Sequence, residues 1–152
     1  MMKIKTLPFA LSFWIILLVS HISAQDNIMV EHKWQKRIIC IVADNATDSL
    51  YKNQIAELTE DVKGLEERKL MIYDIHKDKY RILFPKESAS QWAYSNDIYQ
   101  KYTESEASFN LLLIGLDGGI KLRQQDFLTT KELFRIIDSM PMRRAEIRDG
   151  RY

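Results

Sequence analysis

A hydrophobic run followed by an alternating one spans residues 109–123, FNLLLIGLDGGIKLR. Its first half contains Leu111–Ile114, which leaves no polar face and is typical of a strand buried on both sides. The Asp-Gly-Gly sequence at 117–119 suits the positive φ angles of a tight turn. Lys121 and Arg123 then alternate with apolar residues and should share one face. The pattern predicts a β-hairpin, which the rest of the chain should cover.

Upstream of this hairpin, an amphipathic helix separates two more apolar strands. Residues 37–44, RIICIVAD, and 69–75, KLMIYDI, have the β-branched, apolar character of buried strands. Between them, apolar residues recur at spacings of four and three up to Glu66, which predicts one long helix. Because a helix connects them, the two strands should be parallel with a right-handed crossover.

Three further elements complete the prediction. Residues 80–85 are a short edge strand or an extended link, and residues 91–102 have the spacing of a helix. A capping box, Thr-x-x-Glu at 129–132, begins a last helix, which Pro141 should end. The charged residues 142–152 are expected to form a solvated tail.

The first residues have the character of an export signal. Lys3 and Lys5 precede an apolar run at 7–19, and a small residue, Ala24, follows it. The run is shorter than the ~20 residues that a spanning helix needs. We expect cleavage after Ala24, which would place the protein in the periplasm or outside the cell; an uncleaved anchor is the alternative.

The expected organisation is a signal peptide at 1–24, a leader at 25–33, one domain at 34–148 and a tail at 149–152. The chain is close to neutral, with a formal net charge of +1, and stays so without its first two lysines. Such a balance gives no reason to expect a nucleic-acid partner, nor stable membrane insertion after signal cleavage. An unknown protein or a small anionic ligand is the expected partner.

Cys40 is the only cysteine, so an internal disulfide and a Cys-x-x-Cys redox cycle are both excluded. It lies in the middle of a predicted buried strand, where a thiol is a small, inert core group. His76 lies between Asp74 and Asp78, but His32 is far away in the leader. We therefore expect a solvated loop around His76, no metal site and no cofactor.

The order of elements, strand, long helix, strand, helix, hairpin and helix, resembles a thioredoxin-like fold. The segments WQKRIICIVA, FNLLLIGLDGGIKLR, ELFRIID and SMPMRRAE resemble an uncharacterised family, domain of unknown function 4174. The resemblance covers residues 34–148 and implies an α/β three-layer sandwich, with a mixed central sheet of about four strands and flanking helices. Similar domains occur in bacterial exported proteins and in animal extracellular-matrix proteins, and no settled activity comes with the family.

The resemblance also locates the usual redox site, where this chain has degenerate residues. Asp44, Asn45, Ala46 and Thr47 occupy the place of the Cys-x-x-Cys motif, at the start of the long helix. Residues 107–108, before the hairpin, contain no proline, although a cis-proline is usual there. If the chain is thioredoxin-like, it is so in shape.

Four cations remain as a speculative ligand site: Lys121, Arg123, Arg143 and Arg144. If the two pairs converge, they would hold a carboxylate, a phosphate or a sulfated glycan through charge-assisted bonds. The alternative is that Lys121 and Arg123 protect an exposed edge strand from pairing.

The leading functional prediction is an exported, non-catalytic binding module, since no catalytic constellation can be nominated and an enzyme is the less favoured reading. The alternative is a one-cysteine, peroxiredoxin-like redox protein that uses Cys40. A third hypothesis is a hydrolase or transferase with carboxylates such as Asp44 and Asp74.

Overall fold

The computed structural model describes residues 28–88, 91–103 and 107–151; the predicted signal segment, 1–24, lies outside these residues. One mixed sheet has the strand order β4-β3-β2-β1-β5-β6. β1 and β2 are parallel, and the other neighbours are antiparallel. The strands are β1 (Arg37–Ala43), β2 (Leu70–Ile75), β3 (Lys79–Phe84), β4 (Ala93–Tyr94), β5 (Phe109–Ile114) and β6 (Ile120–Gln124).

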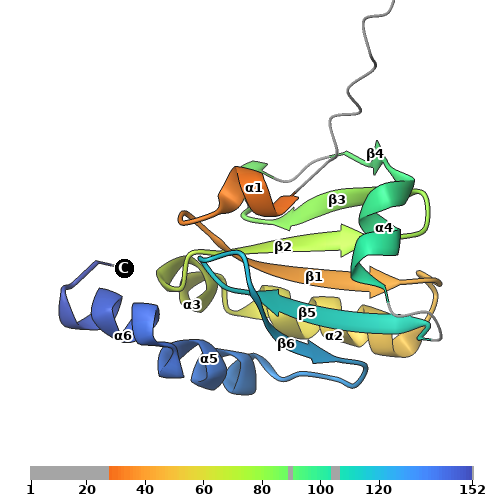
Figure 1. Ribbon diagram of the computed structural model, residues 1–152. Helices are drawn as coiled ribbons and strands as arrows, with labels where there is room; N and C mark the ends of the chain where they lie inside the picture. The colour runs from red at the N-terminus through yellow and green to blue at the C-terminus, as the bar shows by residue number, and fades with distance from the viewer. Residues whose placement is uncertain (1–27, 89–90, 104–106, 152) are drawn as a thin grey trace, which may run out of the picture.

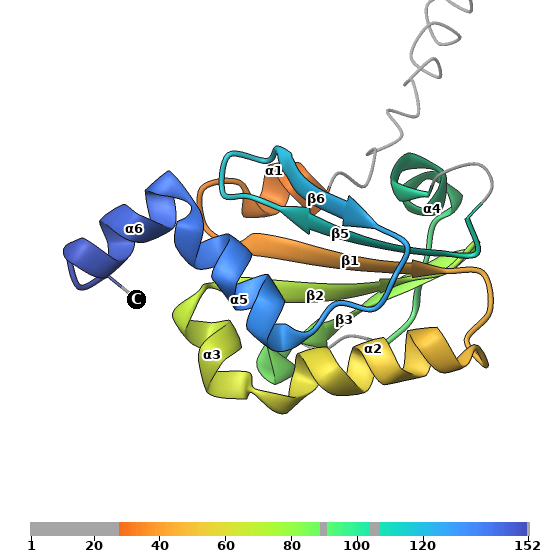
Figure 2. The same cartoon turned by 90° about the horizontal axis from the view of Figure 1, so that it is seen from below.

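Helices cover both faces of the sheet (Figures 1 and 2). One face carries α2, α3 and α5, and the other carries α1 and α4, while α6 extends past the end of the sheet. The helices are α1 (Ile28–His32), α2 (Ser49–Glu60), α3 (Val62–Glu67), α4 (Asn96–Tyr102), α5 (Thr130–Ser139) and α6 (Pro141–Arg148), with a 3₁₀ turn, η1, at Lys86–Ser88. No helix within the described ranges is both long and apolar enough to span a membrane.

The predicted α/β three-layer class is confirmed, and the topology is thioredoxin-like. The β1-α2-β2 unit is parallel, as the helical crossover requires, and α4, the β5–β6 hairpin and α5 follow it. The sheet is larger than the four strands expected, because β3 and β4 extend it beyond β2. β4 has only two residues, and its pairing with β3 leaves no periodic signal in the sequence.

β1 lies at the centre, and all seven of its residues are buried. Alternate side chains enter two separate cores. Ile39 and Ile41 pack beneath α2, α3 and α5, whereas Ile38, Cys40 and Val42 pack beneath α4. The continuous apolar run of this strand therefore has the cause inferred from the sequence, which is burial on both faces.

Local hydrogen bonds explain where the helices differ from the prediction. The helix expected to continue to Glu66 breaks at Asp61, whose carboxylate accepts from the Gly64 amide at 2.9 Å and begins α3. The predicted helix at 91–102 begins only at Asn96. The helix start predicted at Thr129 is confirmed, since Thr129 Oγ1 accepts from the Glu132 amide at 3.2 Å.

The C-terminal segment is not the solvated tail that we expected. α5 ends at Ser139, before Pro141 as predicted, but Pro141 occupies the first turn of a further helix, α6. Arg143 and Glu146 on α6 are buried. Likewise, α1 lies within residues 25–33, and its His32 Nε2 is 2.7 Å from the Tyr73 hydroxyl. Both terminal helices of the described chain therefore contact the domain through side chains, α1 through His32 and α6 through Arg143 and Glu146.

Candidate functional site

The degenerate redox position forms a hydrogen-bonded turn between β1 and α2. Asn45 Oδ1 accepts from the Thr47 amide at 2.9 Å and from its hydroxyl at 2.8 Å. Asp48 then caps α2 by accepting from the Leu50 amide at 2.8 Å. Within Asp44, Asn45, Ala46 and Thr47, the Asn45 amide oxygen thus closes the turn at the place where a thioredoxin would carry thiols.

Asp44 is the charged group at this edge. The Tyr99 hydroxyl donates to its Oδ1, and Lys77 Nζ lies 3.8 Å from its Oδ2. The pKa of Tyr99 is raised because partial burial and the bond to Asp44 both favour the protonated phenol. Asp44 therefore accepts a hydrogen bond from a phenol and lies near an exposed lysine.

Cys40 is fully buried between β2 and β5 and lies beneath Ile98 and Tyr102 of α4. Burial raises the pKa of its thiol from 9.0 to about 12, despite the opposing fields of Arg123 and Lys101. The prediction that Cys40 is a core residue is confirmed by this burial.

A polar network missed by sequence reasoning lies next to this turn, at the carboxyl end of β2. Asp74 is completely buried and accepts from the Tyr51 hydroxyl at 2.9 and 3.0 Å. Arg81 Nε donates to Asp74 Oδ2 at 2.9 Å, and His76 Nε2 lies 3.2 Å from Oδ1. One carboxylate thus joins side chains from α2, β2 and β3.

His76 is only 6% exposed, so our prediction of a solvated loop there is wrong. Its Nδ1 lies 2.8 Å from the Ala43 carbonyl, which can only accept, so Nδ1 carries a proton. Trp92 packs edge-on against the imidazole at 5.3 Å between ring centroids, and the Arg81 guanidinium lies 4.3 Å from the indole centroid. The sequence did contain a signal for the contact between His76 and Asp74. The two residues are two positions apart, so they share a face of an extended chain.

Carboxylate, imidazole and phenol are the groups of acid–base catalysis, yet this cluster is closed to solvent. Tyr51, Asp74 and His76 are all buried. The pKa of Tyr51 is raised because burial and the Asp74 charge both oppose ionisation, so its hydroxyl remains a donor. The arrangement holds β1, β2, β3 and α2 together. Of its members, Arg81 is partly exposed and lines a surface hollow with Trp92.

Three of the four cations proposed from the sequence each bond to a different part of the chain. Lys121 pairs with Asp117 in its own hairpin at 2.7 Å, and Arg123 Nη1 donates to the Tyr102 carbonyl at the end of α4 at 3.1 Å. Arg144 is exposed on α6. Arg143 is buried, and its Nη1 donates to the Glu67 carbonyl at 2.7 Å, which fastens α6 to α3.

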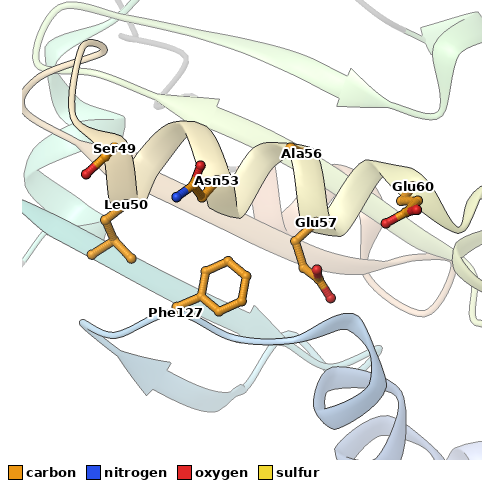
Figure 3. Close-up of a pocket in the computed structure, with 7 residues that line it drawn as sticks. All are labelled: Ser49, Leu50, Asn53, Ala56, Glu57, Glu60 and Phe127. Carbon is orange, nitrogen blue, oxygen red and sulfur yellow. The ribbon is translucent and has the colours of Figure 1, made fainter.

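Two open surface hollows also contain polar side chains. Figure 3 shows a hollow of about 880 Å³ along α2, where Phe127 faces Leu50, Asn53 and Glu57. The Glu57 carboxylate already has a hydrogen-bond partner within the chain, since it accepts from the Thr130 amide at 2.7 Å. The second hollow, of about 590 Å³, is lined by Arg81, Gln91, Trp92 and Tyr94.

Across the described ranges, no group of three or more His, Cys, Asp or Glu side chains could hold a metal ion.

The fold and the turn at residues 44–47 define a thioredoxin-like domain that lacks the cysteine pair. The chain belongs to the family described as domain of unknown function (DUF4174), whose sequence profile matches residues 28–146. No curated protein matches the sequence. Among solved structures, the reduced 2-Cys peroxiredoxin of Plasmodium vivax is similar with a TM-score of 0.48 and 12% identity, over 81% of this chain and 84% of that one.

The buried Asp74 network makes a stability prediction. Asp74→Ala leaves the Tyr51 hydroxyl and the Arg81 guanidinium without their acceptor, so the free energy of unfolding should fall by about 2–4 kcal/mol. Urea unfolding measures this change. Asp78→Ala, at an exposed position in the following turn, is the matched control and should change stability by about 0.5 kcal/mol or less. Equal effects of the two substitutions would contradict a structural role for Asp74.

Proposed function

We propose that this protein is an exported, non-catalytic binding module built on a thioredoxin-like domain. The observation that carries the proposal is the position of Cys40, the only thiol, in the core on the central strand. The turn that bears the redox pair in thioredoxins here carries Asp44, Asn45, Ala46 and Thr47. A thioredoxin-like fold without accessible thiols keeps its capacity to bind partners and loses thiol chemistry.

The competing function is one-cysteine redox chemistry at Cys40. That chemistry needs a thiolate within reach of its substrate. Burial raises the pKa of the Cys40 thiol to about 12, so the thiol is protonated at pH 7. Burial beneath α4 also excludes peroxide from the sulfur. Both features disfavour this alternative.

A hydrolase or transferase with Asp44 and Asp74 has less support. Asp74 is buried and bonded to Arg81 and Tyr51, so it has no access to a substrate. Asp44 is more exposed, but its neighbours are Tyr99 and Lys77. Within the described ranges, the two carboxylates together contact phenols, cations and an imidazole, and none of these groups is paired with them as a nucleophile.

Export is the second part of the proposal, and it rests on the sequence. Lys3 and Lys5, the apolar run at 7–19 and Ala24 have the order of a secretory signal. A chain with one buried cysteine needs no disulfide and folds equally well in an oxidising compartment. The binding module would therefore act in the periplasm or outside the cell.

Peroxide consumption tests the non-redox part. With dithiothreitol as the reductant, hydrogen peroxide should disappear at the same rate with residues 25–152, with its Cys40→Ala variant and without protein. The reason is the inaccessible, protonated thiol. Circular dichroism of both proteins verifies folding. Consumption that depends on Cys40 would refute the proposal in favour of the redox alternative.

Expression of the full chain in a Gram-negative bacterium tests export. The intact mass should correspond to a chain that begins at Gln25, recovered outside the cytoplasm. Leu17→Arg, which places a charge within the apolar run, should leave the full-length chain inside the cell. Recovery of both proteins as full-length chains in the cytoplasm would contradict a cleaved signal.

A further inference from the structure

A small cavity lies at the end of β1 opposite to the redox position. Its volume is about 250 Å³, and it is enclosed by the start of β1, the β5–β6 turn and the junction between α5 and α6. Most of its wall is apolar, and three charged residues also contribute. The lining residues are Arg37, Gly115, Leu116, Asp117, Lys121, Met140, Pro141 and Met142.

Arg37 is the unusual member of this wall. It is only 1% exposed, and its Nη1 donates to Glu146 at 3.1 Å and to the Arg68 carbonyl at 3.0 Å. Its Nε and Nη2 have no hydrogen-bond partner among the residues that the structure describes. Buried donors left unpaired cost about 1–3 kcal/mol each, and more for charged groups. Their presence in a residue of the cavity wall points to an acceptor that the described part of the chain does not supply.

The two unpaired nitrogens define the chemistry of that acceptor. Nε and Nη2 carry the parallel N–H bonds of one edge of the guanidinium, which is the edge that binds a carboxylate through two hydrogen bonds. Because neither nitrogen is reached by solvent, a ligand must displace a neighbouring side chain. Met140 and Met142 line the cavity, and unbranched methionine side chains change conformation at low cost.

The surrounding charges favour an anion. Beneath the cavity wall, four cations share three carboxylates, so the cluster keeps a net positive charge; its members are Arg37, Arg68, Lys69 and Arg143 with Glu67, Asp138 and Glu146. The carboxylate of Asp117 also lines the cavity, but it is paired with Lys121 at 2.7 Å. An entering monoanion would balance the charge of the cluster.

We propose that this cavity binds a small monocarboxylate with an apolar body. The carboxylate binds the Nε–Nη2 edge of Arg37, and the apolar body packs against Leu116, Met140 and Met142. The proposal deepens the binding function by naming its ligand class. The two proposals can fail independently. Cys40 can be inert whether or not this cavity binds a carboxylate, so the peroxide test and the binding test give separate answers.

Calorimetric titration of residues 25–152 with octanoate, octanamide and acetate tests the proposal. Octanamide has the same body without the charge, and acetate has the charge without the body. Octanoate should bind at least tenfold more tightly than either, since only octanoate engages both the guanidinium and the apolar wall. Equal affinity for octanoate and octanamide, or no measurable binding of octanoate, would overturn the proposal.

Three variants locate the site. Arg37→Lys keeps the charge but loses the two-donor edge, and it should weaken octanoate binding at least fivefold. Met142→Trp fills the cavity from a residue that is 42% exposed, so it should do the same without disturbing the buried ion pairs. Arg144→Met, on the exposed face of α6, is the control and should bind octanoate like the parent. Unchanged affinity in Met142→Trp would place octanoate elsewhere and refute the site.

Discussion

The enclosure of β1 between two layers of helices is the constraint on which the rest of the structure depends. All seven residues of this strand are buried, and its two faces belong to separate cores. Fully burying one large aliphatic side chain contributes about 1.5–3 kcal/mol, so the apolar residues of β1 outweigh any single polar contact in the fold. Anything on this strand, thiol or guanidinium, is therefore removed from bulk water.

β1 and the turn that follows it contain three chemically different regions. Arg37, at its start, is buried with an unpaired edge beside a cavity. Cys40, in its middle, is an inert core group. The turn at 44–47, after its end, is closed by its own oxygen acceptors. The binding function that we propose therefore lies at the opposite end of β1 from the edge that carries redox thiols in thioredoxins.

Two polar networks fasten these opposite ends. Asp74 joins α2, β2 and β3 at one end, and Glu146 joins Arg37, Lys69 and Arg143 at the other. Buried ion pairs of this kind add little net stability over apolar contacts, but the loss of one partner is costly. Their contribution is to fix which elements meet, and α6 in particular is positioned by Arg143 and Glu146, its two buried side chains.

Local patterns predicted much of this fold. The β5–β6 hairpin, the parallel β1-α2-β2 unit and the Thr129 cap each follow from signals within a few residues. β4, α6 and the burial of His76 were missed because each depends on a partner distant in the sequence. The sequence of the charged segment at 142–152 is typical of a solvated tail. In the structure, however, Arg143 donates to the Glu67 carbonyl and Glu146 pairs with Arg37.

The candidate site was harder to predict than the fold. Lys121 and Arg143 were chosen for their charge; Lys121 does line the cavity, and Arg143 shares Glu146 with Arg37. Arg37 itself resembled the ordinary polar start of a strand. Its importance comes from burial and from two nitrogens without acceptors, and neither property is encoded in local periodicity.

The measurement that tests the central claim most directly is the alkylation rate of Cys40 in a series of urea concentrations below the unfolding transition, at neutral pH. If β1 is enclosed as described, labelling occurs only through unfolding, and the logarithm of the rate rises with urea with the slope of global unfolding. Fast labelling that is independent of urea would show that Cys40 is accessible in the native protein, and would contradict the account.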